Sequence, residues 1–401
     1  MSPLDIDSSV RSFLQGQQGQ EANPALKAYY PRFEEHYERK LWHQLTLDLL
    51  SFVQEQGVGP RLIPLYQHFI THFQTRLDPL KWIELAVYTS RQYSELKEAS
   101  TFLDGVAKEL LEKKTVPAHI QARMEALHYR LLLGDLTESW EVITECGMAL
   151  DLLASKTAPQ TSVHASYYRV AAEYHKQKGD FGDYYKNALL YLGCVRVDAL
   201  NEEERVGRAK DLAIAALVGD TIYNFGDLLA HPILQAIQGP SSPGAQYSWL
   251  AQALVAFNRG DIGAWDQLET QIPGEPILQE HSAFLRQKIR LEALIETVFR
   301  RTGGSGGGKG SRRLAFGEVA KEAQLGQEEE VEHLVMKALS LNLIRGSIDE
   351  VDRVIEVNWV QPRFLDLDQI NGMHQRLRAW GDDVEACEDY VQSQGPELFG
   401  V

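Results

Sequence analysis

The stretch LHYRLLLGDLTESW, residues 127–140, contains the element that decides the fold, a Gly-Asp dipeptide between two runs with helical spacing of apolar residues. The dipeptide recurs where other such runs meet, at Gly134-Asp135, Gly179-Asp180, Gly219-Asp220 and Gly260-Asp261. Glycine readily adopts the left-handed conformation that ends a helix, and aspartate can accept hydrogen bonds from the free amides that begin the next helix. The offsets, 45, 40 and 41 residues by subtraction, predict a solenoid of stacked helical hairpins.

Apolar residues precede these junctions at helical spacing. Before the first junction they step by 4, 3 and 4 residues along Ile120, Met124, Leu127 and Leu131. Gly-Asp is also a common turn dipeptide, and copies at Gly182, Gly226 and Gly381 fall outside the register. Because the period and the capping residues agree, the pattern favours an all-α solenoid. Its long curved surface suits binding other proteins better than enclosing a small substrate.

The pattern changes after residue 311. Residues 314–324 and 328–342 have the pattern of two short helices, and residues 343–349 and 354–360 are rich in β-branched side chains. Helix, helix, strand, turn, strand is the order of a winged helix, which would cap the helical array. The segment 354–360 alternates poorly, so we expect a strand covered on both faces. Its free edge could accept a strand from a neighbour, and its candidate contact residues are Val354, Val357 and Trp359.

The last helical segment has a different rhythm. Its apolar residues are spaced 3, 4, 3, 4, 3 and 4 apart: Ile370, Met373, Leu377, Trp380, Val384, Cys387 and Val391. We call these seven residues the seam. A 3.5-residue repeat is what a helix needs to pack along another helix. The spacing therefore favours a bundle with partner helices, and packing back onto its own domain is the alternative.

Several long strings resemble the PCI-domain family of the proteasome lid, the signalosome and a translation-initiation factor. They are LWHQLTL at 41–47, YYKNALLYLGC at 184–194, NFGDLLAHPIL at 224–234, and LVMKALSLNLIRGSIDEVD with NWVQPR between 334 and 363. The strings are similar to one lid component of the proteasome in particular, over about residues 25–380. The Gly-rich insert at 303–311 and the N-terminal tail depart from the family pattern.

The resemblance implies tetratricopeptide-like helical repeats, a C-terminal winged helix and a terminal bundle helix. It also implies a non-catalytic structural subunit that supports assembly of the proteasome regulatory particle and ubiquitin-dependent protein degradation. The implied partners are other lid subunits, of PCI and deubiquitinase type, in a hetero-oligomer, with a ubiquitin-receptor subunit as a further candidate. A scaffold subunit of the signalosome or of a translation-initiation factor is the alternative.

These observations divide the chain into five parts. We expect a flexible N-terminal segment at 1–21, N-terminal helical repeats at 22–170, the helical part of the PCI domain with its Gly-rich linker (303–311) at 171–311, the winged helix at 312–362, and the heptad helix and tail at 363–401.

The Gly-rich linker contains two incomplete catalytic motifs. GGSGG at 303–307 satisfies G-x-S-x-G, but a nucleophile elbow needs a strand before Ser305 and a helix directly after it. Gly303, Gly308 and Lys309 nearly form a phosphate loop, but Gly310 stands where the magnesium-binding hydroxyl belongs. A solvated linker is the better interpretation of both.

Other candidate catalytic groups are equally weak. His68 and His72 have metal-ligand spacing but no glutamate between them. Three widely spaced cysteines, Cys146, Cys194 and Cys387, argue against a disulfide framework and for buried thiols in a reducing compartment. We therefore expect no enzyme, no cofactor and no metal.

The charge distribution disfavours nucleic acid and membrane partners. The 401 residues carry a formal net charge of −16. A basic cluster exists at Arg300, Arg301, Lys309, Arg312 and Arg313, but the candidate recognition helix 328–342 sets four glutamates against Lys337. The N-terminus, MSPLDIDSSV, lacks the basic and then apolar residues of a signal peptide, and no apolar run approaches membrane-spanning length. We expect a cytoplasmic and nuclear location.

Overall fold

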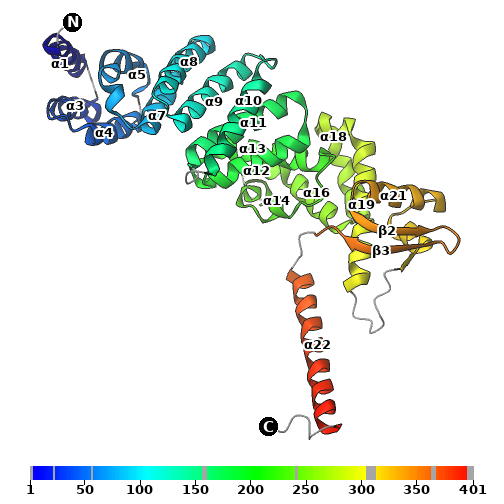
Figure 1. Cartoon of the computed structure of the whole chain (residues 1–401). Helices are drawn as coiled ribbons and strands as arrows, with labels where there is room; N and C mark the ends of the chain where they lie inside the picture. Colours follow the sequence, from blue (N-terminus) through cyan, green and yellow to red (C-terminus); the bar gives the residue numbers. More distant parts are fainter. Residues whose placement is uncertain are drawn as a thin grey trace. The chain divides into compact units, whose positions relative to one another are not determined.

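The computed structural model describes residues 3–20, 23–55, 57–155, 160–239, 243–303, 313–362 and 367–394 (Figure 1). The chain forms two compact units, Met1–Arg196 and Val197–Val401. The division differs from the expected boundary at residue 170, because that residue lies in the middle of the continuous helix α11 (Thr161–Lys178). No helix among these residues is both long enough and apolar enough to span a lipid bilayer.

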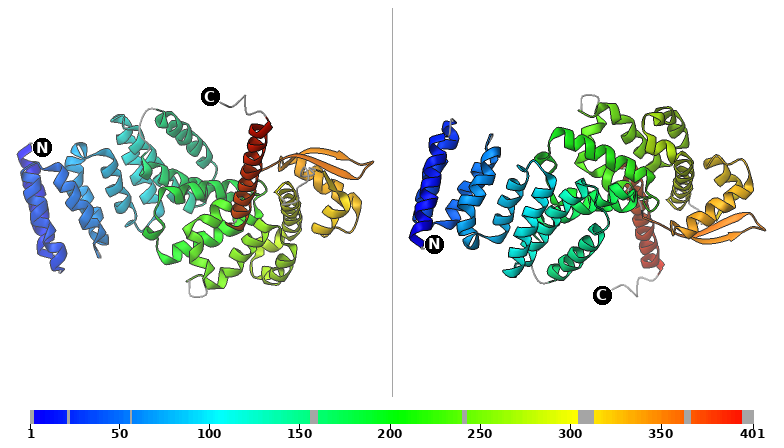
Figure 2. Two further views of the ribbon diagram at one scale, coloured as in Figure 1. Left: turned by 90° about the horizontal axis from the view of Figure 1, so that it is seen from below. Right: turned by 90° about the horizontal axis from the view of Figure 1, so that it is seen from above.

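The first unit is a stack of helices, which lie side by side in both views of Figure 2. In chain order they are α1 (Pro3–Gln20), α2 (Pro24–Lys27), α3 (Tyr29–Glu38), α4 (Trp42–Gln54), α5 (Gly59–Leu65), the π-helix η1 (Tyr66–Ile70), α6 (Thr71–Phe73), the 3-10 turn η2 (Gln74–Arg76), α7 (Pro79–Ser90), α8 (Leu96–Glu112), α9 (Val116–Leu132), α10 (Ser139–Ala154), α11 and α12 (Phe181–Cys194). Helices α8 and α9 pack as one hairpin, and α11 and α12 as another. The predicted all-α repeat is confirmed.

The expectation of a flexible segment at 1–21 is wrong for its helical part. Helix α1 buries Val10 and Leu14, each 1% exposed, in the core that contains Tyr30 and Phe33 of α3. These apolar residues are four apart and so lie on one face of the helix. Phe13 packs against the same core. The polar, Gln- and Gly-rich composition of the segment hides this short helical stripe.

The predicted left-handed glycine is present at three of the four Gly-Asp junctions. Gly134, Gly179 and Gly260 have φ of 85°, 83° and 65°, the left-handed conformation that ends a helix. Gly219 has φ −59° and is not left-handed. That junction is closed in another way, described below.

The predicted capping of the next helix by aspartate is confirmed at one junction and is absent at another. Asp261 accepts a hydrogen bond from the Ala264 amide, at 3.0 Å, and so caps the next helix as expected. Asp180 occupies the capping position of α12 without a side-chain capping bond, and its carboxylate lies 2.8 Å from the Lys178 ammonium instead. That ion pair lowers the pKa of Asp180.

We expect Gly260→Ala to cost about 3 kcal/mol of stability and Gly134→Ala about 1 kcal/mol. Both replacements force a left-handed L-residue, which costs about 1–2 kcal/mol. At Gly260 the new Cβ would also lie 2.6 Å from the Cα of Ala293, whereas at Gly134 it would meet nothing within 4 Å. Denaturant unfolding measures both changes. Equal losses in the two variants would contradict the close packing of Gly260.

The second unit begins with helices and ends with strands and a long helix. Its elements are η3 (Val197–Ala199), α13 (Glu202–Val218), α14 (Gly226–Ala230), η4 (Pro232–Leu234), α15 (Gln235–Gln238), η5 (Ala245–Tyr247), α16 (Ser248–Arg259), α17 (Ile262–Leu268), η6 (Glu269–Gly274), α18 (Pro276–Glu280), α19 (Ser282–Gly303), β1 (Arg313–Ala315), α20 (Phe316–Glu322), α21 (Glu328–Ser340), β2 (Ile344–Asp349), β3 (Val354–Val360) and α22 (Leu367–Gln394).

The predicted winged helix is present. Helices α20 and α21 precede an antiparallel sheet of order β1-β3-β2. Its core joins residues of α21, such as Val335, to Ile355 and Val357 of β3 and to Leu294 and Val298 of α19. Strand β1 was not expected, because a three-residue strand is too short to display an alternating pattern.

A buried lysine on α19 closes the end of α13. The Lys288 side chain is fully buried, and its ammonium donates to the carbonyl oxygens of Ala216 at 2.8 Å, Leu217 at 3.0 Å and Gly219 at 2.7 Å. Three acceptors match the three donors of a protonated lysine, and a cation at this end of a helix complements the helix dipole. Burial lowers the pKa of Lys288 to about 7. Lysine thus satisfies carbonyls at the one junction whose glycine is not left-handed.

Candidate functional site

The seam predicted for partner binding lies on α22, a helix of 28 residues. Its side chains are all exposed: Ile370 49%, Met373 38%, Leu377 65%, Trp380 67%, Val384 47% and Val391 46%, together with Cys387. Among the residues of the second unit that the structure describes, none covers this apolar row. A contiguous exposed apolar surface of this kind is typical of an interaction site.

The residues that flank the second half of the seam are mostly acidic. In heptad terms Asp383 and Glu388 directly flank the seam in its second half, where Asp382, Glu385 and Asp389 add further negative charge. Flanking charges of a heptad helix select the partner and its orientation. A helix that packs along this half is expected to be basic.

The expectation about strand 354–360 is wrong in two respects. β3 is the central strand, paired with β1 at Val354, Ile355 and Glu356 and with β2 along its length. It is also covered on one face, since Ile355 and Val357 are buried while Glu356 and Asn358 are exposed. The outer strands are β1 and the longer β2. Leu314, expected in a helix, lies in β1, the strand that occupies the supposed free edge.

The three candidate residues of β3 consequently have different surroundings. Val357 is 2% exposed and belongs to the core, and Val354 is half-buried between its two strand partners. Trp359 is 37% exposed and lies under the guanidinium of Arg345, 4.7 Å from the ring centre. Of the three, Trp359 is the residue available for a contact.

The cysteines fit the expectation of buried thiols only in part. Cys146 is buried, and burial raises the pKa of its thiol. Cys194 is partly buried, with its pKa raised by the same cause. Cys387 is exposed, because the seam to which it belongs is uncovered.

The other weak candidates gain no support as sites. His68 is exposed, and its ring lies 5.3 Å from that of Phe13; His72 is also exposed. The motifs at Ser305 and at Gly308 to Gly310 lie outside the described residues. Of the basic cluster only Arg313 has a described side chain, which lies 3.7 Å from the Glu356 carboxylate.

Comparison with known proteins matches both units. The family model of PSD13 N-terminal repeats matches residues 29–254, and the PCI domain model matches residues 265–359. The 26S proteasome non-ATPase regulatory subunit 13 homolog B of Arabidopsis thaliana is 37% identical over 95% of this chain and 97% of its own length.

Two fungal proteins are similar over comparable lengths. The probable 26S proteasome regulatory subunit rpn9 of Schizosaccharomyces pombe is 35% identical over 99% of this chain and 100% of its own length. The 26S proteasome regulatory subunit RPN9 of Saccharomyces cerevisiae is 34% identical over 94% of this chain and 96% of its own length. Proteins of other complexes are similar over smaller parts of the chain. COP9 signalosome complex subunit 7 of Drosophila melanogaster is 19% identical over 46% of this chain and 59% of its own length. Eukaryotic translation initiation factor 3 subunit M of Nematostella vectensis is 23% identical over 23% of this chain and 24% of its own length.

Proposed function

Because the chain belongs to the PCI-domain family of 26S proteasome non-ATPase regulatory subunit 13, we propose that it is a non-catalytic structural subunit of the proteasome regulatory-particle lid. In this role it supports assembly of the particle and thereby ubiquitin-dependent protein degradation. Near-full-length similarity to 26S proteasome subunits favours this function over a place in the signalosome or a translation-initiation factor, to which the similarity is weaker and partial.

The exposed seam of α22 is the observation that carries the proposal within the structure. Leu377 and Trp380, near the middle of the helix, are 65% and 67% exposed. Burying such side chains contributes about 1.5–3 kcal/mol each. Seven seam residues give on the order of 10 kcal/mol gross, from which association and ordering costs subtract several. That suffices for stable incorporation into a bundle of helices from neighbouring lid subunits.

The winged-helix sheet supplies a second contact. With β3 in the centre, the outer strand β2 and the exposed pair of Arg345 and Trp359 form the surface for a neighbouring PCI subunit. An outer strand carries backbone groups that can pair with another chain.

We expect Trp359→Ser to weaken association with lid partners about tenfold, because exposed tryptophans at interfaces often dominate binding energy. Val351→Ser is the matched control, since Val351 is 93% exposed. Titration of the tagged chain against its partners measures both. Equal affinities of the two variants would remove Trp359 from the interface.

The proposal also names the classes of partner that contact the seam. The seam joins helices of PCI and deubiquitinase-type lid subunits, and a ubiquitin-receptor subunit is a further candidate neighbour. The proposal includes a cytoplasmic and nuclear location for the protein.

Affinity purification of the tagged full chain at gentle salt, followed by mass spectrometry, tests the proposed function. Stoichiometric recovery of proteasome lid subunits is the expected result. Recovery of signalosome or translation-factor subunits in their place would overturn the proposal and favour the corresponding alternative.

A further inference from the structure

The outer face of α10 carries an exposed apolar ridge. One face of this helix packs against α9 and α11, and in both views of Figure 2 the blue-green α10 lies on the outer side of the stack. Trp140, Met148 and Leu152 are 48%, 58% and 66% exposed. Together with Thr144 they are spaced four residues apart and form one row along the helix, which we call the α10 ridge. Twelve helical steps from Trp140 to Leu152 span about 18 Å.

The indole of Trp140 is held in place at one end of the α10 ridge. Its ring stacks on Tyr174 of α11, with the ring centres 5.6 Å apart, and lies edge-on to His175, with the ring centres 5.8 Å apart. A side chain that is already ordered loses little conformational entropy when a partner binds. Tryptophan is also among the residues that contribute most to binding at interfaces. This end of the ridge is therefore suited to anchor a partner.

The hydroxyl groups along the α10 ridge already have hydrogen-bond acceptors within the helix. The Thr144 hydroxyl donates to the Trp140 carbonyl oxygen at 2.9 Å, and the Ser155 hydroxyl donates to the Leu152 carbonyl oxygen at 2.8 Å. An extended segment laid on this face would find no backbone partners for the peptide groups that it turns toward α10. A helix satisfies its own backbone and needs none. The face therefore suits a helix better than an extended segment.

Acidic side chains flank the α10 ridge. Residues 135–155 contain no Lys, Arg or His and five acidic residues: Asp135, Glu138, Glu141, Glu145 and Asp151. By helical geometry Glu141 and Glu145 lie beside the ridge on one side and Asp151 on the other. Glu145 lies 2.9 Å from Arg123 of α9, whereas the other four have no ion-pair partner among the residues that the structure describes.

The lysine near the Trp140 end of the ridge does not offset this charge. Lys178 lies one helical turn beyond Tyr174, and its ammonium is 2.8 Å from the Asp180 carboxylate. The unpaired charge along the α10 ridge is therefore negative. A partner that covers the ridge must bring positive charge to its flanks, because complementary charge favours binding and like charge opposes it.

We propose that the outer face of α10 binds a basic amphipathic helix of a partner protein. Apolar side chains of that helix pack against Trp140, Met148 and Leu152, and lysines or arginines on its flanks face Glu141 and Asp151. About three turns of the partner helix match the length of the ridge, and recognition through one apolar helix face is a common mode of binding. This contact is additional to those of α22 and the winged helix and goes beyond the lid function proposed above.

The test measures binding of labelled synthetic helices by fluorescence anisotropy. The basic peptide has about 20 residues, long enough to form a helix alone, with leucines on one face and lysines on the flanks. The acidic peptide has glutamate for each lysine, and the broken peptide has proline in its central turn. The protein is the full chain with Leu377→Asp and Trp380→Asp, so that the seam of α22 does not capture the peptides. We expect the basic peptide to bind at least tenfold more tightly than either of the others.

Substitutions on α10 locate the site. Met148→Ser with Leu152→Ser should weaken binding of the basic peptide at least tenfold. The matched control is Leu47→Ser with Leu190→Ser, two leucines of α4 and α12 that are each 50% exposed, and it should leave binding unchanged. Because all four side chains are exposed, these variants keep the core intact, which circular dichroism verifies.

A charge swap tests the flanks of the α10 ridge. Glu141→Lys with Asp151→Lys should reverse the preference, so that the acidic peptide binds more tightly than the basic one. Equal binding of the basic and acidic peptides, or a basic preference that survives the swap, would overturn the proposal.

Two further outcomes would assign the face to another occupant and overturn the proposal. One is equal binding of the broken peptide, which would indicate an extended segment. The other is a dimer of the chain in analytical ultracentrifugation that Met148→Ser with Leu152→Ser dissociates, which would indicate a second copy. Because these assays contain no lid subunits, either outcome leaves the proposed lid function untouched.

Discussion

A chain that carries both Leu377→Asp and Trp380→Asp should fold normally and fail to join the lid. The two side chains are 65% and 67% exposed, so their replacement removes no contact within the chain's described core. Losing two buried apolar side chains at the interface costs about 3–6 kcal/mol. Burying two unpaired carboxylates adds to that loss, so the affinity should fall by a factor of about 1,000 or more.

The matched control for this experiment is Gln375→Asp with Ala379→Asp. It adds the same two charges to the same helix, at exposed positions outside the seam. The chain with the control substitutions should co-purify with lid subunits, while the seam variant should not. Normal co-purification of the seam variant would count decisively against the bundle role of α22.

Lys288→Met should cost about 3 kcal/mol of stability, although Lys288 is distant in sequence from the three carbonyls to which its ammonium donates. Methionine keeps the apolar stem but leaves the carbonyls of Ala216, Leu217 and Gly219 without their donor. Each unsatisfied buried group costs about 1–3 kcal/mol, offset in part because a buried charge is removed. Chemical unfolding measures the change.

The control is Arg286→Met on the same helix, where an exposed arginine pairs with Glu269. An exposed ion pair contributes about 0–1 kcal/mol. Equal stabilities of the two variants would contradict the capping role of Lys288.

The same lysine predicts a pH dependence. Burial lowers the pKa of Lys288 to about 7 in the folded chain, and an unfolded lysine has a pKa of about 10.4. The unfolded chain therefore binds more protons between these values, so the stability should rise with pH from about 7 to 10 and this contribution should be flat below 7. Lys288→Met should lose that slope, and an unchanged slope would assign it to other groups.

The sequence predicted the parts of this fold that depend on local pattern. The left-handed glycines at Gly134, Gly179 and Gly260 and the order of α20, α21, β2 and β3 were read correctly, because helical period and turn chemistry are local properties. The seam was likewise visible as a heptad.

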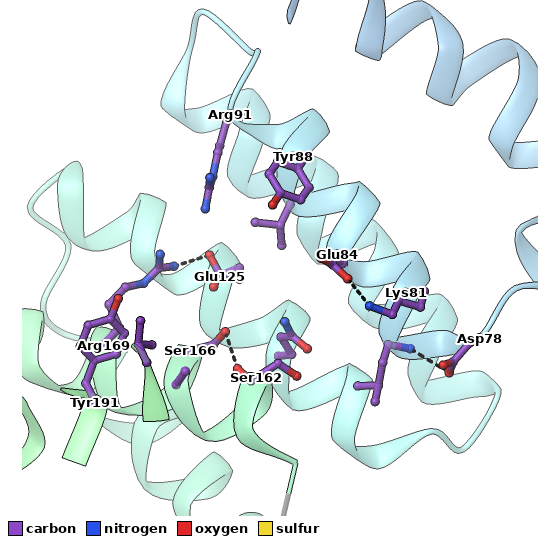
Figure 3. A pocket seen from close by; sticks show the side chains of 15 residues that line it. Asp78, Lys81, Glu84, Tyr88, Arg91, Glu125, Ser162, Ser166, Arg169 and Tyr191 are labelled. Carbon is purple, nitrogen blue, oxygen red and sulfur yellow. Dashed lines mark hydrogen bonds and ion pairs between the residues drawn. The ribbon is translucent and has the colours of Figure 1, made fainter. Parts of the chain in front are cut away.

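The missed features depend on contacts between distant residues. Lys288 and its acceptor Ala216 are 72 residues apart. No local pattern in the sequence therefore indicates that a lysine closes the end of α13, where Gly219 is not left-handed. Strand β1 takes its identity from pairing with β3, about 40 residues later. A pocket of the first unit is lined by Gln121, Arg91 and Arg169 from three different parts of the helical stack (Figure 3), which composition alone does not reveal.

The bare seam of α22 has a consequence for the life of the protein before assembly. In the proposed lid bundle partner helices cover Leu377 and Trp380, whereas a copy that has not assembled displays both side chains. Chaperones and proteases act on proteins that expose apolar surface of this kind, so a surplus copy would be a substrate for both. On this proposal, removal of unassembled copies would match the supply of the chain to that of its partners.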